Sequence, residues 1–130
     1  MKNNIVLLVI ALLLSGCKDK SNDNLVKVYY VPFSNIFYVH VTIADIEERA
    51  PYYLESREPN VYKTVSDLLI EGKGVCVFNE QGVRAKIMLG DKIFYVDDKG
   101  CVLSKDHHYL VEPTAFEKTI ISLAKKRVKN

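Results

Sequence analysis

The side chains that could carry out covalent chemistry in this chain are three cysteines, three histidines and scattered serines. A hydrolase needs a nucleophile beside a base, and a third group that orients the base. No serine lies in a Gly-x-Ser-x-Gly turn, and nothing in the spacing selects a thiol–imidazole pair from Cys76 or Cys101 and His107 or His108. Phosphate-cradling glycine loops are absent from the sequence. We therefore expect no catalytic residues and a protein that is not an enzyme.

Acidic residues and histidines gather in the last third of the chain and suggest a metal site. They are Asp97, Asp98, Asp106, His107 and His108. Their spacing matches no familiar metal site, and an Asp-Asp-Lys-Gly run is typical of a turn. We predict no metal site and no cofactor, and a metal- or small-ligand-binding module using His107 and His108 stays as an alternative hypothesis.

The remaining cysteine, Cys17, ends an N-terminal segment that has the layout of an export signal. Residues 1–4 carry a positive charge, residues 5–14 are all aliphatic, and the small residues Ser15 and Gly16 precede Cys17. A charged start, a short apolar core and small residues at the cleavage point are the three parts of a secretory signal. A membrane span needs about 20 apolar residues, so this run is too short to be one.

The stretch Leu14-Ser15-Gly16-Cys17 resembles the lipobox of bacterial lipoproteins, in which a small residue precedes an invariant cysteine. The resemblance covers residues 1–17 only. It implies that residues 1–16 are removed and that Cys17 is lipidated and becomes the mature N-terminus, anchored by several acyl chains in the membrane. Because Lys18 rather than Asp follows the cysteine, the outer membrane, facing the periplasm, is favoured over the inner membrane.

The charge and composition of the mature chain limit the classes of partner that it could bind. Loss of Lys2 leaves 17 of the 18 Lys and Arg residues against 16 Asp and Glu residues, which is nearly neutral. A nucleic-acid binder needs a strong basic surface, so nucleic acid is not an expected partner. Residues 17–24 are the lipidated cysteine and an entirely polar tether, and seven extended residues reach at most about 25 Å. Residues 25–130, the globular domain, must therefore lie close to the membrane.

Hydrophobic periodicity in residues 25–130 predicts one small α+β domain, an antiparallel β-meander packed by two helices at about 61–71 and 115–127. We expect Asn60 to cap the first helix, and Thr114 with Glu117 to form a capping box on the second. A short helix is expected at 44–50, a loop at 51–59 and a buried His40. The predicted strands are 25–31, 36–43, 75–78, 83–89, 92–96, 101–103 and 108–111.

Two features of this domain remain open. An oxidising compartment favours a disulfide between Cys76 and Cys101. A simple meander would instead place the Cα atoms of these cysteines three strand spacings apart, or about 14 Å. A disulfide tolerates a Cα separation of at most about 7 Å, so the meander argues against the bond. The loop at 51–59 carries Tyr52 and Tyr53, which are the kind of amphipathic anchors that protein interfaces favour.

From these observations we predict that the chain is a lipid-anchored, non-enzymatic protein-binding lipoprotein of the bacterial cell envelope. An inhibitor or an immunity-type factor is our first hypothesis, with an unidentified protein as partner and Tyr52 and Tyr53 as contact residues. A structural accessory of an envelope membrane complex is the alternative.

Overall fold

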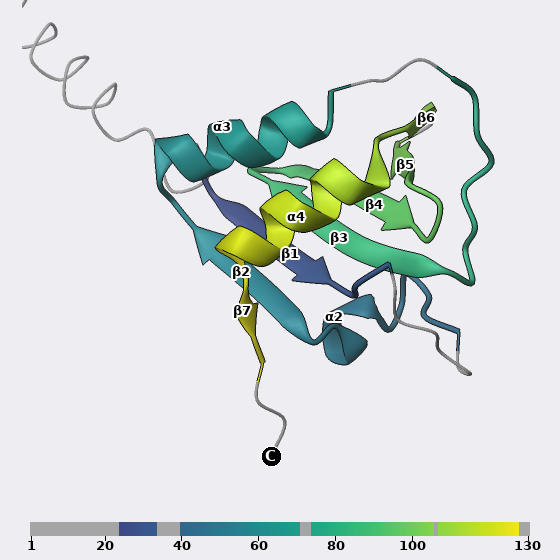
Figure 1. The fold of residues 1–130 in the computed structure, drawn as a ribbon, viewed down its shortest axis with the longest axis horizontal. Helices are drawn as coiled ribbons and strands as arrows, with labels where there is room; N and C mark the ends of the chain where they lie inside the picture. The colour runs from purple at the N-terminus through teal and green to yellow at the C-terminus, as the bar shows by residue number, and fades with distance from the viewer. Residues whose placement is uncertain (1–23, 34–39, 71–73, 106, 128–130) are drawn as a thin grey trace, which may run out of the picture.

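A computed structural model of the chain describes residues 24–33, 40–70, 74–105 and 107–127, and we restrict the structural account to these ranges. Seven antiparallel strands form a sheet in the order β6-β5-β4-β3-β1-β2-β7 (Figure 1). The elements are β1 (Val26–Tyr30), α2 (Ile46–Arg49), β2 (Tyr52–Ser56), α3 (Pro59–Leu68), β3 (Val83–Leu89), β4 (Lys92–Asp97), β5 (Cys101–Ser104), β6 (His107–Leu110), α4 (Pro113–Leu123) and β7 (Lys125–Lys126). The predicted small α+β domain is confirmed, including a meander from β3 to β6.

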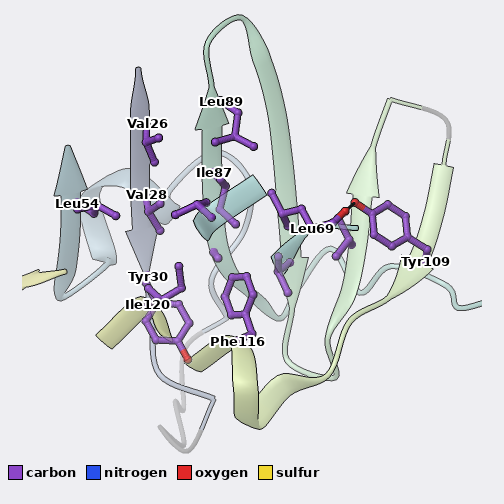
Figure 2. Packing of buried hydrophobic residues seen from close by; sticks show 14 residues of the cluster. Val26, Val28, Tyr30, Leu54, Leu69, Ile87, Leu89, Tyr109, Phe116 and Ile120 are labelled. Atoms are coloured by element: carbon purple, nitrogen blue, oxygen red, sulfur yellow. Dashed lines mark hydrogen bonds between the residues drawn. The ribbon is translucent and has the colours of Figure 1, made fainter. Parts of the chain in front are cut away.

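The two longer helices, α3 and α4, lie together across one face of the sheet (Figure 1). The alternate residues of β1 that face them, Val26, Val28 and Tyr30, are fully buried, as are Ile87 on β3 and Ile120 on α4. Burial of each such side chain contributes about 1.5–3 kcal/mol. Figure 2 shows these side chains converging between sheet and helices into the main core.

Specific polar contacts fix both helices on this face. The Tyr109 hydroxyl on β6 donates a hydrogen bond to the Leu69 carbonyl oxygen, 2.6 Å away, at the end of α3 (Figure 2). On α4, the carboxylate of Glu117 accepts from the Tyr30 hydroxyl at 2.8 Å and from the backbone N–H of Phe33 at 2.9 Å. Burial and the Glu117 carboxylate both raise the pKa of Tyr30, so its hydroxyl keeps the proton that this bond requires.

The predicted helix limits and caps need correction. The helix expected at 61–71 is α3, Pro59–Leu68, with Glu58 in place of Asn60 at the N-cap, because Pro59 suits the first helical position. The capping box is wrong as well. Glu112 takes the N-cap position of α4 and accepts from the backbone N–H groups of Thr114 and Ala115, so Glu117 is left to bind β1.

The helix expected at 115–127 ends at Leu123, and two of the residues expected in its last turn form a strand instead. Lys125 and Lys126 form β7, which pairs with Tyr53 and Tyr52 of β2. The apolar stripe of α4 stops at Ala124, so a longer helix would bury no further surface. Extended backbone at this point instead supplies hydrogen bonds to the outer side of β2.

Two predictions about strands are wrong, and one is only partly testable. Residues 51–59, expected as a loop, contain β2, whose alternation of inward Leu54 and outward Glu55 is obscured by prolines at both ends of the segment. Residues 75–78, expected as a strand, lie outside the sheet.

The strand predicted at 36–43 can be tested only in part, because residues 36–39 fall outside the described ranges. Of the remainder, Val41 makes an isolated bridge to Gly82, and His40 is exposed instead of buried.

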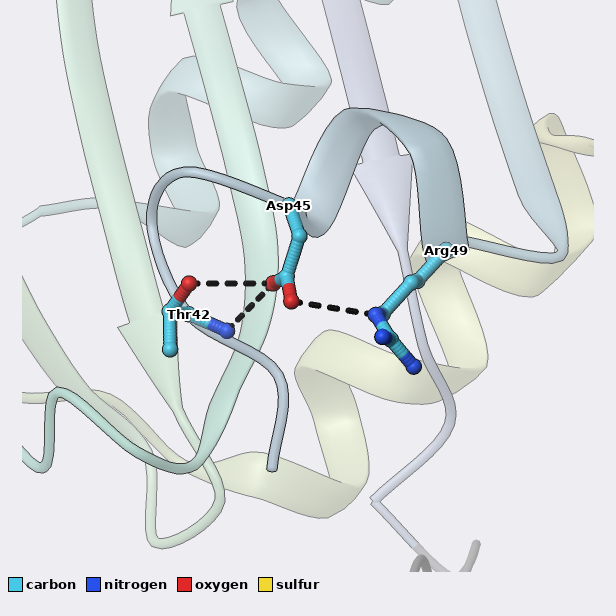
Figure 3. Close-up of polar contacts among 3 residues, drawn as sticks. All are labelled: Thr42, Asp45 and Arg49. Atoms are coloured by element: carbon cyan, nitrogen blue, oxygen red, sulfur yellow. Dashed lines mark hydrogen bonds and ion pairs between the residues drawn. The ribbon is translucent and has the colours of Figure 1, made fainter. Parts of the chain in front are cut away.

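A second, smaller hydrophobic cluster lies on the opposite face, at one end of the sheet. Its buried members are Val31, Val41, Ile46, Ala50, Phe78, Val83 and Cys101. The short helix α2 contributes to this cluster and is held at both ends. The Asp45 carboxylate accepts from the backbone N–H and hydroxyl of Thr42 and from Nε of Arg49 (Figure 3), and the Thr42 N–H lowers the pKa of Asp45. The Arg127 guanidinium donates to the Glu47 carbonyl oxygen at the other end.

The segment that connects α3 to β3 is attached to this second face by a disulfide and by a buried carboxylate. Cys76 and Cys101 form the disulfide, with Cα atoms 6.0 Å apart. The sequence leaves this pairing open because it predicts that Cys76 lies in a strand of the meander. In the structure, residues 75–78 do not join the sheet, and Cys76 lies next to Cys101 at the start of β5. Asp97, 1 % exposed, accepts from the backbone N–H groups of Asn79, Lys99 and Cys101.

We predict that Asp97→Asn lowers the free energy of unfolding by about 1–3 kcal/mol, because the amide places an NH₂ group against a backbone N–H in a buried site. The matched control is Asp98→Asn. The neighbouring Asp98 is half-buried and has only a long contact, 3.4 Å, with the Asn79 side chain, so its change should stay within about 0.5 kcal/mol. Urea unfolding of both variants measures the difference, and equal losses would contradict the role of Asp97.

Candidate functional site

The described residues cover the face of the sheet opposite α3 and α4 only in part, and its more open part is the candidate site. The second cluster and α2 occupy one end. Next to them, strands β2, β1, β3 and β4 present two rows of side chains fixed by the strand register, which we call the open half-face. Its inner row borders the second cluster, against which Tyr29 and Tyr95 pack. The inner row is Tyr53, Tyr29, Lys86 and Tyr95, and the outer row is Glu55, Lys27, Met88 and Ile93.

The inner row is an aromatic stripe with a cation in it. The rings of Tyr29 and Tyr53, directly opposite each other on β1 and β2, have centroids 5.0 Å apart. Lys86 Nζ lies 5.9 Å from the centre of the Tyr95 ring, within the range of a cation–π interaction. Large rings held by their neighbours lose little conformational entropy on binding, which is why tyrosines recur at protein interfaces.

Lys86 keeps its charge in this setting. Its Nζ lies 2.6 Å from the Glu47 carboxylate of α2. Partial burial disfavours the ammonium, but the hydrogen bond to Glu47 and the nearby tyrosine hydroxyls prevail, so the pKa of Lys86 is raised. The inner row therefore presents a half-buried cation between two aromatic groups.

The outer row mixes charged and apolar side chains. Lys27 Nζ and the Glu55 carboxylate form a partly exposed ion pair of 3.5 Å, which contributes little to stability. Beside them, Met88 is half-buried and Ile93 remains 41 % exposed. An exposed isoleucine next to a flexible methionine and an aromatic stripe makes a surface suited to a protein partner.

The structure separates the two tyrosines that the sequence grouped together. Because successive strand residues point to opposite faces, Tyr52 lies on the helix side, where its ring is 6.4 Å from that of Tyr30 at the edge of the main core. Tyr53 lies on the open half-face. Of the two predicted contact residues, only Tyr53 is therefore placed with the candidate surface.

Among the described residues, the groups considered for metal binding form no cluster, and the two thiols considered for catalysis are bonded to each other. Both candidate thiols are joined in the disulfide, so neither Cys76 nor Cys101 can act as a nucleophile while it is intact. His108 Nδ1 accepts a hydrogen bond from the backbone N–H of Phe78 at 3.3 Å, and His107 is exposed. Within the described ranges, no group of three or more His, Cys, Asp or Glu side chains could hold a metal ion. Asp106 lies outside those ranges.

The open half-face lies at the end of the sheet where Leu25 leads into β1. The backbone N–H of Gly90, in the turn between β3 and β4, donates to the carbonyl oxygen of Leu25 at 2.8 Å. The outer row, with Lys27, Met88 and Ile93, is close to this turn in sequence and register. Cys17 itself lies outside the described residues. None of the helices described is both long and apolar enough to span a membrane.

Sequence reasoning missed most of this surface. Alternation in residues 83–89 predicts the half-buried strand β3, but which face the helices cover depends on tertiary packing, and the sequence predicts a loop where β2 lies. Tyr29, Lys86 and Tyr95 become neighbours only through strand pairing. The comparisons add no relative to this account, since no family model, no curated protein and no solved structure matches the chain.

The pKa of Tyr53 provides a test of the arrangement of the inner row. Burial, followed by the negative charge of Glu55 and the nearby Tyr29, raises the pKa of Tyr53 from 10.0 to about 12. We predict that Glu55→Gln lowers the pKa of Tyr53 toward its ordinary value, and that Glu48→Gln, an exposed change on α2, does not. The ring-carbon chemical shift of Tyr53, followed by NMR against pH, measures both.

The same shift predicts a pH dependence of stability. The neutral phenol is favoured in the folded chain, so its contribution is fully present below the unfolded pKa of about 10 and is lost as the pH rises through about 12. The difference in unfolding free energy between the native chain and Tyr53→Phe should therefore shrink in this window. A difference that stays constant across it would contradict the assignment.

Proposed function

We propose that the chain is a lipid-anchored, non-enzymatic protein of the bacterial cell envelope that binds another protein through the open half-face. The observation that carries this proposal is the half of the sheet face that the described residues leave open, with three partly exposed tyrosines, a lysine and an exposed isoleucine on neighbouring strands. An inhibitor or immunity-type role fits a small domain that offers a preformed surface and brings no catalytic group to it.

The proposed anchor gives the surface a defined position. Residues 18–24 join Cys17 to a domain that begins beside the β3–β4 turn, and they can extend at most about 25 Å. The open half-face would therefore lie within reach of partners at the membrane surface. Several acyl chains at about 0.8 kcal/mol per buried CH₂ group are sufficient for stable anchoring.

Anchoring is tested at Cys17. In cells labelled with radioactive palmitate, the native chain should incorporate label and fractionate with membranes. The Cys17→Ser variant should remain unlabelled and unprocessed, because it lacks the sulfur that forms the thioether. The disulfide cysteines give a control, since a Cys76→Ala/Cys101→Ala double variant should still be labelled. Label on Cys17→Ser would contradict the lipoprotein assignment.

Partner binding is tested by comparing two isoleucines of nearly equal exposure on opposite sides of the domain. Ile93 is 41 % exposed on the open half-face, and Ile121 is 39 % exposed on α4. A photo-crosslinking amino acid placed at position 93 of the full chain in cells should give one discrete adduct, and the same amino acid at position 121 should give none.

With that partner in hand, Ile93→Arg should weaken its binding about tenfold or more, as loss of a central contact does, and Ile121→Arg should leave it unchanged. Tyr53→Ala against Tyr52→Ala provides a second matched pair. Identical adducts at positions 93 and 121, or none at either, would contradict the use of the open half-face.

A further inference from the structure

At the start of β4, beside the open half-face, one edge of the backbone has no strand partner among the described residues. The ladder between β4 and β5 consists of the pairs Tyr95–Leu103 and Val96–Val102. Beyond Leu103, β5 leaves β4 and turns at Lys105, which adopts a positive φ of 50°. Lys92–Phe94 therefore pairs with β3 on one side and, among the described residues, with no strand on the other.

The direction of the backbone groups on this edge follows from the hydrogen bonds of β3. The Val31 N–H donates to the Arg84 carbonyl oxygen, and the Gly90 N–H donates to that of Leu25, so even-numbered residues of β3 face β1. In an antiparallel ladder the odd-numbered residues must then face β4, where Ile87 opposes Phe94. Phe94 thus bonds to β3, and the N–H and C=O groups of Ile93 point the opposite way, into the space that β5 has left.

That space is a pocket of about 780 Å³. It is lined by Asp91, Lys92, Ile93, Phe94, Tyr95, Leu103, Ser104 and Lys105. Its apolar wall comes from the exposed Ile93 and the half-buried Tyr95 and Leu103. Ligand pockets in proteins commonly have 300–1,000 Å³ with a few polar groups at an apolar wall, so this volume suits one or two side chains of a bound segment.

The charges around the pocket opening indicate which kind of peptide segment the pocket would bind. Lys92 and Lys105 are both exposed, and neither forms an ion pair within the described ranges. Among the described residues that line the pocket, two lysines stand against one acidic residue, Asp91, so these residues carry a net positive charge. Acidic side chains would therefore be attracted to them, more strongly at low salt.

We propose that this fork between β4 and β5 binds an extended, acidic segment of the partner protein by strand addition. The segment's backbone would pair with Ile93, alternate apolar side chains would enter the pocket, and Asp or Glu residues would face Lys92 and Lys105. The inference rests on the proposed function, since it takes the partner to be a protein, and it adds the conformation and charge of the segment that is recognised.

The test uses the full chain in detergent micelles and a library of random linear peptides. Selection should enrich peptides that alternate apolar residues with Asp or Glu. Lys92→Glu/Lys105→Glu should weaken the best peptide at least tenfold, whereas the control Lys118→Glu, an exposed change on α4, should leave its affinity unchanged.

Amide hydrogen exchange supplies the direct readout of strand addition. Saturating peptide should slow exchange at the Ile93 N–H at least tenfold, whereas the adjacent Phe94 N–H, already bonded to β3, should change little. Enriched peptides that leave Ile93 unprotected, or that lack acidic residues, would overturn the inference. Failure to enrich any peptide would overturn it as well, and the proposed function would still stand if photo-crosslinking at position 93 yields a partner.

Discussion

The buried carboxylate of Asp97 is the constraint on which the two-faced shape of this domain depends. It accepts three backbone N–H groups, one from the segment after Cys76 and two from the turn that starts β5. A carboxylate that is 1 % exposed is tolerable only with such partners, so these donors must be in place together. The disulfide lies at the residue where this network ends, Cys101, and the two restraints reinforce each other.

The position of this restraint determines which part of the sheet is covered. The segment that Asp97 holds packs Phe78 into the second cluster together with Val83 and α2, at the end where β1 finishes and β3 begins. The helices α3 and α4 lie across the other face and enclose the main core (Figure 1). What remains among the described residues is the half of the second face nearest Leu25 and the β3–β4 turn, and its tyrosines are ordered by cross-strand contacts and by the edge of the second cluster.

The class of fold was predictable because periodicity and turn residues are local properties. Alternation in β3 and the stripe of Phe116 and Ile120 in α4 both led to correct elements. The candidate surface was not predictable, because it depends on which strands pair. β2 pairs with β1, although α2 separates the two strands in the sequence. Pro51 and Pro59 flank β2 and make its sequence resemble a loop. The sequence therefore does not predict that Tyr53 lies opposite Tyr29. The disulfide stayed open for the same reason, since a crossover and a strand at 75–78 look alike in sequence.

The edge strand β7 also affects the tendency of the protein to aggregate at high concentration. β7 is only two residues long, and both are exposed lysines, Lys125 and Lys126. An edge that is short and carries charge is a poor template for another strand, since a second copy would have to place its own lysines against them. β7, which pairs with the outer side of β2, is therefore an edge that disfavours the addition of strands in fibril growth.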